Sequence, residues 1–333
     1  MENNIDFLAI GDVVIDAFIK LNDAHVQEGV NHENRELCVR FGDKVPYESV
    51  DVVYAVGNSA NAAVSASRLG LKSAFLSYIG DDQNGKECLA TLQKDKVDTK
   101  YVFAIPNMKT NYHYVLWYGA ERTILVKHEE YPYKFPKIPE KVGWIYLSSM
   151  AENSAGYHDE IGKYAIAHPE TKLVFQPGTF QMKMGTEKLK DIYQNTYLFF
   201  CNKEEAERIL KLKSQKDIMV LLKRIHALGP KIVCVTDGPN GSYAYDGTDA
   251  WKINMYPDIA PPVSRTGAGD AFSSTFATAL ALGKTIPEAL TWGPINSMSV
   301  VQGVGAQKGL LSREKLEEYL KNAPKDYKPV KIN

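Results

Sequence analysis

Short apolar runs alternate with amphipathic stretches along most of this chain. Six runs are brief, apolar and bounded by polar residues or glycine, which is typical of strands buried on both faces. They are Phe7–Ile10, Ser73–Ile79, Trp144–Leu147, Lys172–Phe175, Tyr197–Phe200 and Lys231–Thr236. Helical patterns follow at Ala60–Leu69, Gly85–Lys94, Tyr157–Ala167, Lys203–Lys211, Asp217–Leu228, Ala268–Leu282, Pro287–Val301 and Ser312–Leu320. Strands that alternate with helices predict parallel β-α-β units, and therefore an α/β fold in which helices cover both faces of one sheet.

Two stretches, residues 17–55 and 99–127, break this alternation. They hold strand-like pieces with no helix between them, namely Glu36–Phe41, Tyr101–Ile105, Tyr112–Tyr118 and Arg122–Lys127. A turn at Tyr118–Glu121 predicts a hairpin. We expect both stretches to form a small antiparallel β lid beside a main domain of residues 1–16, 56–98 and 128–333. The aromatic residues of the lid either face a ligand or form its own small core; they are Tyr112, Tyr114, Trp117 and Tyr118.

Composition narrows the function classes. The 333 residues carry 39 basic and 40 acidic side chains, a net charge of −1. Because nucleic-acid binding usually needs a basic face, we expect no nucleic-acid partner. Four cysteines lie far apart with no C-x-x-C pair, which argues against a disulfide framework or structural zinc and favours a cytoplasmic protein. The acidic amino terminus is no secretory signal, and no membrane span is expected.

The sharpest local feature is a glycine-rich turn that opens into the helix at Ala268–Leu282. Thr266 and Gly267 lead into Ala268, Gly269 and Asp270. Unpaired backbone N–H groups at the positive end of a helix dipole form a cradle for an anionic oxygen, above all phosphate. A carboxylate beside such a cradle suits a base that takes a hydroxyl proton during attack on phosphorus. The alternative is that Asp270 only complements the start of the helix.

Two further segments carry possible ligand chemistry. Gly80–Glu87 nearly fits a phosphate-binding P-loop, but Glu87 stands where a hydroxyl should hold magnesium, so we expect helix-capping and turn roles there. No G-x-G-x-x-G follows the first strand, which gives a Rossmann dinucleotide site little support. Asp12 and Asp16 follow that strand instead, at the edge where open α/β sheets bind ligands. They are candidates to accept hydrogen bonds from sugar hydroxyls, and the alternative is surface turn chemistry.

Together these segments form an ordered series of motifs. In chain order they are Gly11-Asp12 with Asp16, Val56–Asn61, Arg68–Gly70, Gly80–Gly85, Asn202–Glu205, Thr236–Gly241, Thr266–Asp270 and Gly305-Ala306. From about residue 5 to about residue 320 the chain resembles the ribokinase-like (PfkB-type) carbohydrate kinases, a family that includes adenosine kinase. The resemblance implies a three-layer α/β/α sandwich with a mostly parallel sheet and a small β lid, and it implies ATP and Mg²⁺ as cofactors.

The resemblance also implies a role for each matching residue. Asp270 would be the catalytic base, and Gly267, Ala268 and Gly269 would form the anion hole. Asn202 and Glu205 would organise Mg²⁺ and the phosphates, largely through water. The remaining ATP-binding residues would be Thr236, Gly238, Gly241, Thr266 and Asn296, the last near the adenine. Asp16, Gly57 and Asn61 would hold the sugar hydroxyls with help from Asp12. The lid would close over the sugar and provide a homodimer contact.

Several positions depart from the family pattern. Val56 replaces a glycine, and Asn58 and Val14 replace polar positions of ribose-specific members, which puts ribose itself in doubt. Ser264 replaces an aspartate that helps to ligate a monovalent cation, so dependence on K⁺ stays open. The segment Gln176–Gln181 lacks the asparagine and arginine of many sugar kinases. Arg122 either meets an acidic or phosphorylated substrate or is a solvated hairpin residue.

The sequence therefore predicts an ATP-dependent kinase that phosphorylates a hydroxyl of a sugar or sugar-like small molecule. The first alternative is a nucleoside kinase of the same fold, because the aromatic lid offers surfaces on which a base can stack. The second is a non-catalytic protein that senses a sugar or nucleotide. Which sugar or nucleoside is the acceptor depends on side-chain placement that spacing does not define.

Overall fold

One large sheet forms the centre of the molecule. The computed structural model describes residues 4–28, 35–119 and 121–332. Within these ranges the large sheet contains β1 (Ile5–Ile10), β6 (Ser73–Gly80), β7 (Asp98–Ile105), β10 (Val142–Leu147), β11 (Lys172–Phe175), β12 (Thr196–Asn202), β13 (Ile232–Thr236), β14 (Ser242–Tyr245), β15 (Ala250–Ile253) and β16 (Val330–Ile332). Their order is β16-β15-β14-β13-β12-β11-β10-β1-β6-β7. The pairings from β13 to β7 are parallel, and β14, β15 and β16 continue the sheet in antiparallel fashion.

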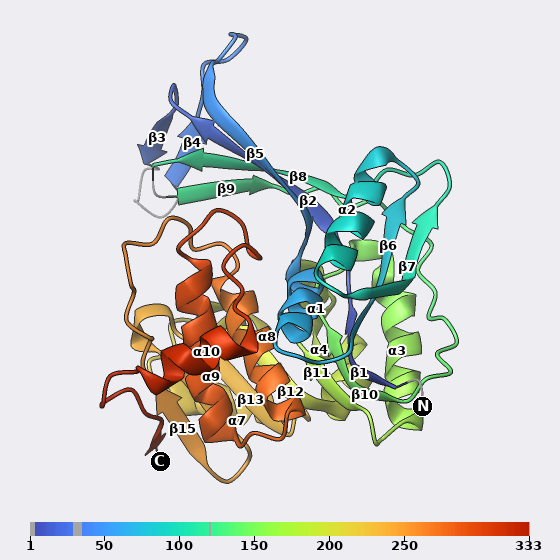
Figure 1. Cartoon of the computed structure of the whole chain (residues 1–333), viewed down its shortest axis with the longest axis vertical. Helices are drawn as coiled ribbons and strands as arrows, with labels where there is room; N and C mark the ends of the chain where they lie inside the picture. Colours follow the sequence, from blue (N-terminus) through green and yellow to red (C-terminus); the bar gives the residue numbers. More distant parts are fainter. Residues whose placement is uncertain (1–3, 29–34, 120, 333) are drawn as a thin grey trace.

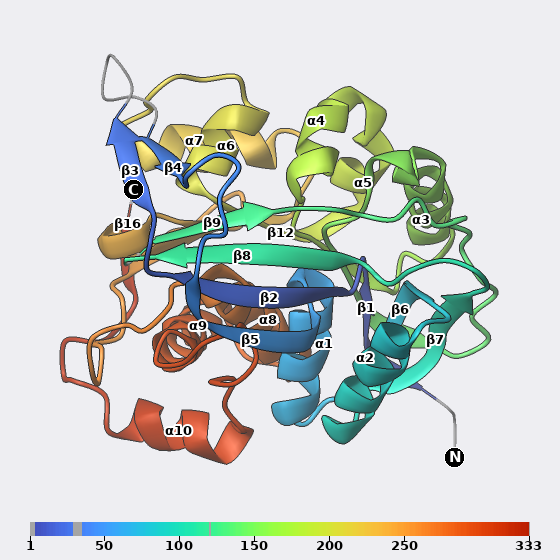
Figure 2. The ribbon, with the colours of Figure 1, turned by 90° about the horizontal axis from the view of Figure 1, so that it is seen from above.

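Helices cover both faces of this sheet (Figure 2). The first face carries α1 (Asn58–Arg68), α2 (Gln83–Lys94), α8 (Ala268–Ala281), α9 (Ile286–Val300) and α10 (Arg313–Lys321). The second carries α3 (Ala155–Ala167), α4 (Thr179–Lys188), α5 (Lys190–Asn195), α6 (Lys203–Ile209) and α7 (Ile218–His226). Successive side chains of a strand point to opposite faces, so Phe7 and Ala9 join one core while Leu8 and Ile10 join the other. The expected α/β fold with a mostly parallel sheet is confirmed.

A smaller sheet projects from the carboxyl edge of the large one (Figure 1). It contains β2 (Val14–Leu21), β5 (Tyr47–Val56), β8 (Tyr112–Tyr118) and β9 (Glu121–Leu125), in the order β5-β2-β8-β9. Only the β2–β8 pairing is parallel among these described strands. A separate pair, β3 (His25–Glu28) and β4 (Arg35–Cys38), lies beside it. We call these six strands the lid.

The structure differs from the predicted elements in several places. We expected Tyr101–Ile105 in the lid, but β7 pairs in parallel with β6, and α2 provides the crossover between them. Within the predicted piece Glu36–Phe41, β4 ends at Cys38. The pattern did not predict α4, α5, β14, β15 or β16. Residues 1–3, 29–34 and 333 of the expected domains, and Ala120 of the expected hairpin turn, lie outside the described residues.

The segment that resembles a P-loop has a capping role, as expected. Asp82 is the N-cap of α2, and its Oδ1 accepts a hydrogen bond of 2.8 Å from Gly85 N. Asp82 Oδ2 accepts another of 3.0 Å from Thr110 N. These bonds stabilise the start of α2 and anchor the chain that leads into β8. In the described ranges, every helix is too short or too polar to cross a membrane.

Candidate active site

Three adjoining pockets follow the carboxyl edge of the large sheet. The lid-side pocket is lined by Asp12, Val14, Asp16, Val56, Gly57, Asn58, Asn61, His113, Ile124, Val126, His128, Ser149, Thr179, Phe180, Thr266, Gly267, Asp270 and Ala306. The central pocket is lined by Asn58, Gln176, Phe200, Cys201, Asn202, Glu205, Thr236, Gly267, Gly269, Asp270, Phe272 and Ser273. The outer pocket shares Asn202, Thr236, Gly269 and Phe272 with the central one. Neighbouring pockets therefore share walls, and the shared residues define one continuous cleft.

The first turn of α8 lies where the lid-side and central pockets meet. Gly267 is its N-cap, with φ of 85°, a conformation that favours glycine. A Cβ at this position would lie 2.4 Å from the Cβ of Ala306, so close packing also requires glycine. Gly269 lines both the central and the outer pocket, and Ala268 lines the outer one. The helix thus turns its amino-terminal backbone toward the cleft, as the sequence predicted.

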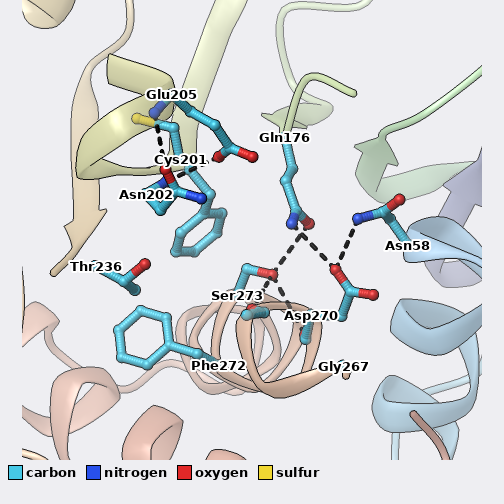
Figure 3. Close-up of a pocket in the computed structure, with 12 residues that line it drawn as sticks. Asn58, Gln176, Cys201, Asn202, Glu205, Thr236, Gly267, Asp270, Phe272 and Ser273 are labelled. Carbon is cyan, nitrogen blue, oxygen red and sulfur yellow. Dashed lines mark hydrogen bonds between the residues drawn. The ribbon is translucent and has the colours of Figure 1, made fainter. Parts of the chain in front are cut away.

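Asp270 is held by three amide side chains. Asn58 Nδ2 donates to Oδ1 at 2.8 Å, and Asn61 Nδ2 donates to Oδ2 at 2.8 Å. Gln176 Nε2 donates to Oδ1 at 3.2 Å (Figure 3). Burial raises the pKa of Asp270 above its ordinary value, and the three donors oppose this because they stabilise the charged form. The result is an oriented carboxylate with a raised pKa, which suits a general base.

Further hydrogen bonds orient two of these amides. Gln176 Oε1 accepts from Tyr146 Oη and, at 3.1 Å, from Ser273 Oγ. These bonds direct Nε2 toward Asp270, as Figure 3 shows for Ser273, Gln176 and Asp270. Gln307 Nε2 donates to Asn61 Oδ1 at 3.0 Å. Sequence reasoning gave no role to Asn58, Gln176 or Gln307. The only signal in the sequence was position, because Asn58 follows Gly57 and Gln176 directly follows a strand that ends at the ligand-binding edge.

Asn202 and Glu205 form a reciprocal cap at the start of α6. Asn202 Oδ1 accepts from Glu205 N at 2.8 Å, and Glu205 Oε2 accepts from Asn202 N at 2.9 Å. Both side chains line the central pocket together with Thr236 (Figure 3). Burial raises the pKa of Glu205. In the described chain, no group of three or more His, Cys, Asp or Glu side chains is placed to hold a metal ion. This donor set therefore fits a Mg²⁺ ion held largely by water and phosphate oxygens rather than by a protein cage.

The outer pocket contains most of the predicted nucleotide residues. Thr236, Gly238 and Gly241 line it as expected. Gly241 has φ of 94°, and a Cβ there would meet the backbone oxygen of Ile253 at 2.1 Å, so only glycine fits. Thr266 lines the lid-side pocket rather than the outer one.

Asn296, which was predicted to lie near the adenine, is a residue of the core. It is fully buried and lines none of the three pockets, as far as the described residues define them. Its Nδ2 donates to Thr275 Oγ1 at 2.7 Å, and its Oδ1 accepts from Leu311 N at 3.0 Å. The amide nitrogen and the amide oxygen of Asn296 therefore both form hydrogen bonds inside the core. On the same helix, Pro294 and Ser297 line the outer pocket instead.

All four predicted sugar-binding residues line the lid-side pocket, but two have their polar groups engaged. Asp12 accepts hydrogen bonds from Tyr133 Oη at 2.7 Å and from Ala151 N at 2.9 Å, and its Oδ2 lies 2.7 Å from His128 Nδ1. The amide of Asn61 joins Asp270 to Gln307, as described above. In this structure, Asp12 therefore orients neighbouring protein groups, and Asn61 orients the carboxylate of Asp270.

Arg122 is partly exposed, and it is not among the described residues that line the lid-side pocket. Its guanidinium lies 3.9 Å from the ring centroid of Trp117 and donates to the Val263 backbone oxygen at 3.2 Å. Arg122 is therefore a half-exposed hairpin residue whose guanidinium also contacts the lid and the loop at Val263. Among the described residues, the wall of the lid-side pocket also contains none of the four lid aromatics that were expected either to face a ligand or to form a small core, namely Tyr112, Tyr114, Trp117 and Tyr118. Ser264, which replaces the family's aspartate, is buried, and its Oγ accepts from Thr266 N at 3.3 Å.

Comparisons with known proteins agree with this architecture. Ribokinase of Bacillus subtilis is 29% identical over 271 residues, which cover 79% of this chain and 87% of that protein. Fructoselysine 6-kinase of Escherichia coli is 24% identical over 260 residues, covering 78% and 94% respectively. Among solved structures, Arabidopsis thaliana ribokinase complexed with ribose and ATP has a TM-score of 0.78 at 19% identity, covering 96% of this chain and 99% of that one.

A nucleoside kinase of Methanocaldococcus jannaschii has the same fold, with a TM-score of 0.76 at 19% identity and coverage of 95% and 98%. The profile of the pfkB family carbohydrate kinases matches residues 30–313, which is most of the chain. The predicted family is therefore confirmed: this chain belongs to the pfkB family of carbohydrate kinases.

Proposed function

We propose that this kinase transfers the terminal phosphoryl group of ATP to a hydroxyl of a sugar or sugar-like small molecule. The position of Asp270 carries the proposal. This side chain lines both the lid-side pocket, where the acceptor would lie, and the central pocket, where the phosphates would lie. A base at that junction reaches the acceptor hydroxyl while the N-terminus of α8 faces the group being transferred.

The proposed step follows from this placement. The acceptor hydroxyl oxygen forms a bond to the terminal phosphorus, the bond from that phosphorus to the bridging oxygen of ADP breaks, and Asp270 takes the hydroxyl proton. Backbone N–H groups at Gly267, Ala268 and Gly269 stabilise the negative oxygens of the transferring group. Phosphoryl transfer depends mainly on alignment and charge stabilisation, which is what a rigid helix terminus and an oriented carboxylate provide.

Asn202 and Glu205 would hold Mg²⁺ through water in this proposal. When bound, Mg²⁺ supplies positive charge that neutralises the phosphates during transfer. The reciprocal cap keeps both side chains at the wall of the central pocket, where they position the water around the phosphates. The glycines of the outer pocket allow a nucleotide to approach the backbone closely.

A nucleoside is the second candidate acceptor. Phe180 lines the lid-side pocket, and an aromatic ring can stack on a base. The aromatic residues of the lid, Tyr112, Tyr114, Trp117 and Tyr118, are not among the described residues that line this pocket. The pocket wall therefore favours a sugar. A non-catalytic sensor is disfavoured because four side chains converge to orient Asp270 and its partners.

The test measures ADP release with a panel of sugars and nucleosides. Asp270→Asn should bind ATP nearly as the wild type does but lose at least about 10²-fold in kcat, the size of a general-base contribution. Asp159→Asn is the matched control, because Asp159 pairs with Lys188 on the surface away from the cleft. Near wild-type turnover by Asp270→Asn would remove Asp270 from its role. Faster turnover of a nucleoside than of any sugar would make the second candidate the first.

The lid also supports a homodimer proposal. Paired residues on adjacent strands share a face of the sheet, so Ala17 and Val52 lie on the same side, as do Ala17 and Tyr114. This face is opposite to the one that carries Asp16 and His113. Its exposed apolar residues are Val50, Val52, Tyr114 and Leu125. An apolar sheet face that points away from the cleft is suited to pack against a second copy of this chain.

A further inference from the structure

Two imidazoles in the lid-side pocket have no part in the proposed transfer step. His113 lies on β8, and His128 follows β9 on the return to the large sheet. Both line the pocket, and their ring centroids are 5.2 Å apart. Each ring has a carboxylate near its Nδ1, from Asp12 or from Asp16. The lid thus contributes an imidazole pair to the place where the acceptor would lie.

His128 is held rigidly. Its Nδ1 lies 2.7 Å from Asp12 Oδ2, and because an ionised carboxylate only accepts hydrogen bonds, Nδ1 carries the hydrogen. In the neutral ring Nε2 is then an acceptor. Asp12 is itself fixed by Tyr133 and Ala151, and the ring meets Phe180 edge-on at 5.8 Å between centroids. This ring presents a fixed polar edge to the pocket.

His113 has an unsatisfied atom. Its Nδ1 lies 3.5 Å from Asp16 Oδ1, and only 8% of the residue is exposed. Nε2 is buried and has no hydrogen-bond partner among the described residues. Buried polar atoms in folded proteins are nearly always paired, so an unpaired one on a residue of the pocket wall calls for a partner, either an ordered water or a group of a ligand.

The charge of the pocket limits what that ligand is. Asp12, Asp16 and Asp270 line it, and its described wall contains neither lysine nor arginine. Arg122 of the lid hairpin is not part of this wall; its guanidinium stacks on Trp117 and donates through Nη2 to the Val263 backbone oxygen, while its Nε has no partner among the described residues. A phosphate group would therefore be placed among carboxylates without a cation, which disfavours its binding. Hydroxyl groups, in contrast, can donate to the carboxylates and to imidazole nitrogens.

We infer that His113 is a specificity-determining residue that hydrogen-bonds an acceptor hydroxyl through Nε2, and that the lid-side pocket selects an uncharged, polyhydroxylated acceptor over a phosphorylated one. This inference rests on the proposed function and adds the acceptor class to it. His128, positioned by Asp12, forms the second polar contact. Val14 and Ile124 offer the apolar surface on which the C–H face of a sugar can lie.

Binding and turnover are measured separately to test this. Each probe is titrated into the wild-type protein with a non-hydrolysable ATP analogue, and its KM and kcat are measured by ADP release. The probes are D-ribose, D-fructose and adenosine, together with D-ribose 5-phosphate and D-fructose 6-phosphate. We expect at least one uncharged probe to bind at least about 10-fold more tightly than its phosphorylated counterpart. Equal or tighter binding of every phosphorylated probe would overturn the inference.

The His113→Phe variant tests the residue itself. We expect KM for the best uncharged probe to rise roughly 10-fold, as for a lost hydrogen bond, with kcat and the KM for ATP little changed. His113→Gln, which keeps a polar atom near the Nε2 position, should restore most of the affinity. Thermal unfolding checks that the His113→Phe variant folds. If it does not, His113→Ala removes the same hydrogen-bonding atom without adding bulk, and the same change in KM is expected.

His168→Phe is the matched control, because His168 also has a carboxylate at its Nδ1, that of Glu170 at 3.2 Å, but lies outside the pocket. Its KM for the acceptor should equal that of the wild type. An unchanged KM in folded His113→Phe would contradict the role of His113. Tight acceptor binding without turnover would instead contradict the proposed function and leave the selectivity result standing.

Discussion

At the scale of single residues, the main feature of the cleft is the balance of effects on Asp270. Burial raises its pKa, and hydrogen bonds from Asn61, Asn58 and Gln176 lower it, with the net shift upward. A base works only in its ionised form, so activity is lost as the pH falls through this raised pKa. The three amide side chains therefore influence the pKa of Asp270, and through it the pH at which activity is lost on the acidic side of the rate profile.

We predict that Asn58→Ala moves the acidic limb of the pH profile of kcat/KM to higher pH. Removing a donor to the charged form leaves burial less opposed, so the pKa of Asp270 rises further. Initial rates between about pH 5 and 9 would show the shift. Asn195→Ala is the control, because the Asn195 amide is exposed and bonds only the Asp191 backbone oxygen. A limb that stays in place, or moves to lower pH, would show that Asn58 does not tune the base.

At the scale of elements, the lid uses its two faces differently. One face carries Asp16 and His113 toward the cleft, and the other carries Val50, Val52 and Tyr114 outward. Successive side chains of a strand point to opposite faces of the sheet, so each lid strand contributes residues to both the cleft face and the outward face. The hydrophobic pattern alone left open whether the lid aromatics face a ligand or form a small core, because it does not show which face of a strand meets the cleft.

We predict that Val52→Lys converts a dimer into a monomer. Val52 is 39% exposed on the outward face, and a charge there would be desolvated on association. Sedimentation velocity at micromolar concentration would detect the change in mass. Ile166→Lys is the control, because Ile166 is an exposed apolar residue on α3, away from the lid. A wild-type chain that sediments as a monomer would contradict the dimer proposal.

At the scale of the whole molecule, the lid is tied to the nucleotide side of the cleft. Arg122 of β9 donates to the Val263 backbone oxygen, and Val263 N donates to the Val301 oxygen at 2.8 Å. Val301 and the neighbouring Pro262 line the outer pocket. These contacts connect β9 of the lid to residues that line the outer pocket.

We predict that Arg122→Ala uncouples ATP hydrolysis from transfer. A lid held less firmly admits water to the cleft, so acceptor-independent ADP release should rise several-fold while the yield of phosphorylated acceptor per ADP falls. Parallel assays of ADP and of phosphorylated product would measure this ratio. Arg313→Ala, which removes only a surface pair with Glu317, should keep the wild-type ratio. An unchanged ratio in Arg122→Ala would show that the contact does not control closure.

The prediction of elements succeeded where the signal is local. The buried parallel strands and the helices between them were found because each carries its own apolar pattern and boundaries. Tyr101–Ile105 was assigned to the lid because the sequence of a strand does not show which other strand it pairs with. In the structure the crossover through α2 brings this segment alongside β6, with which it pairs in parallel. The antiparallel strands β14, β15 and β16 at one end of the sheet are only three or four residues long, which is too short for a clear period.

The sequence by itself determined the family motifs, the positions that must be glycine, and Asp270 at the start of a helix. Those features depend on neighbours a few residues away. Only the tertiary structure decided that Asn58, Asn61 and Gln176 meet Asp270 from 212, 209 and 94 residues away, and that Asn296 is a core residue. Hydrogen bonds act over about 3 Å in space, and contacts between distant segments are created only when the chain folds.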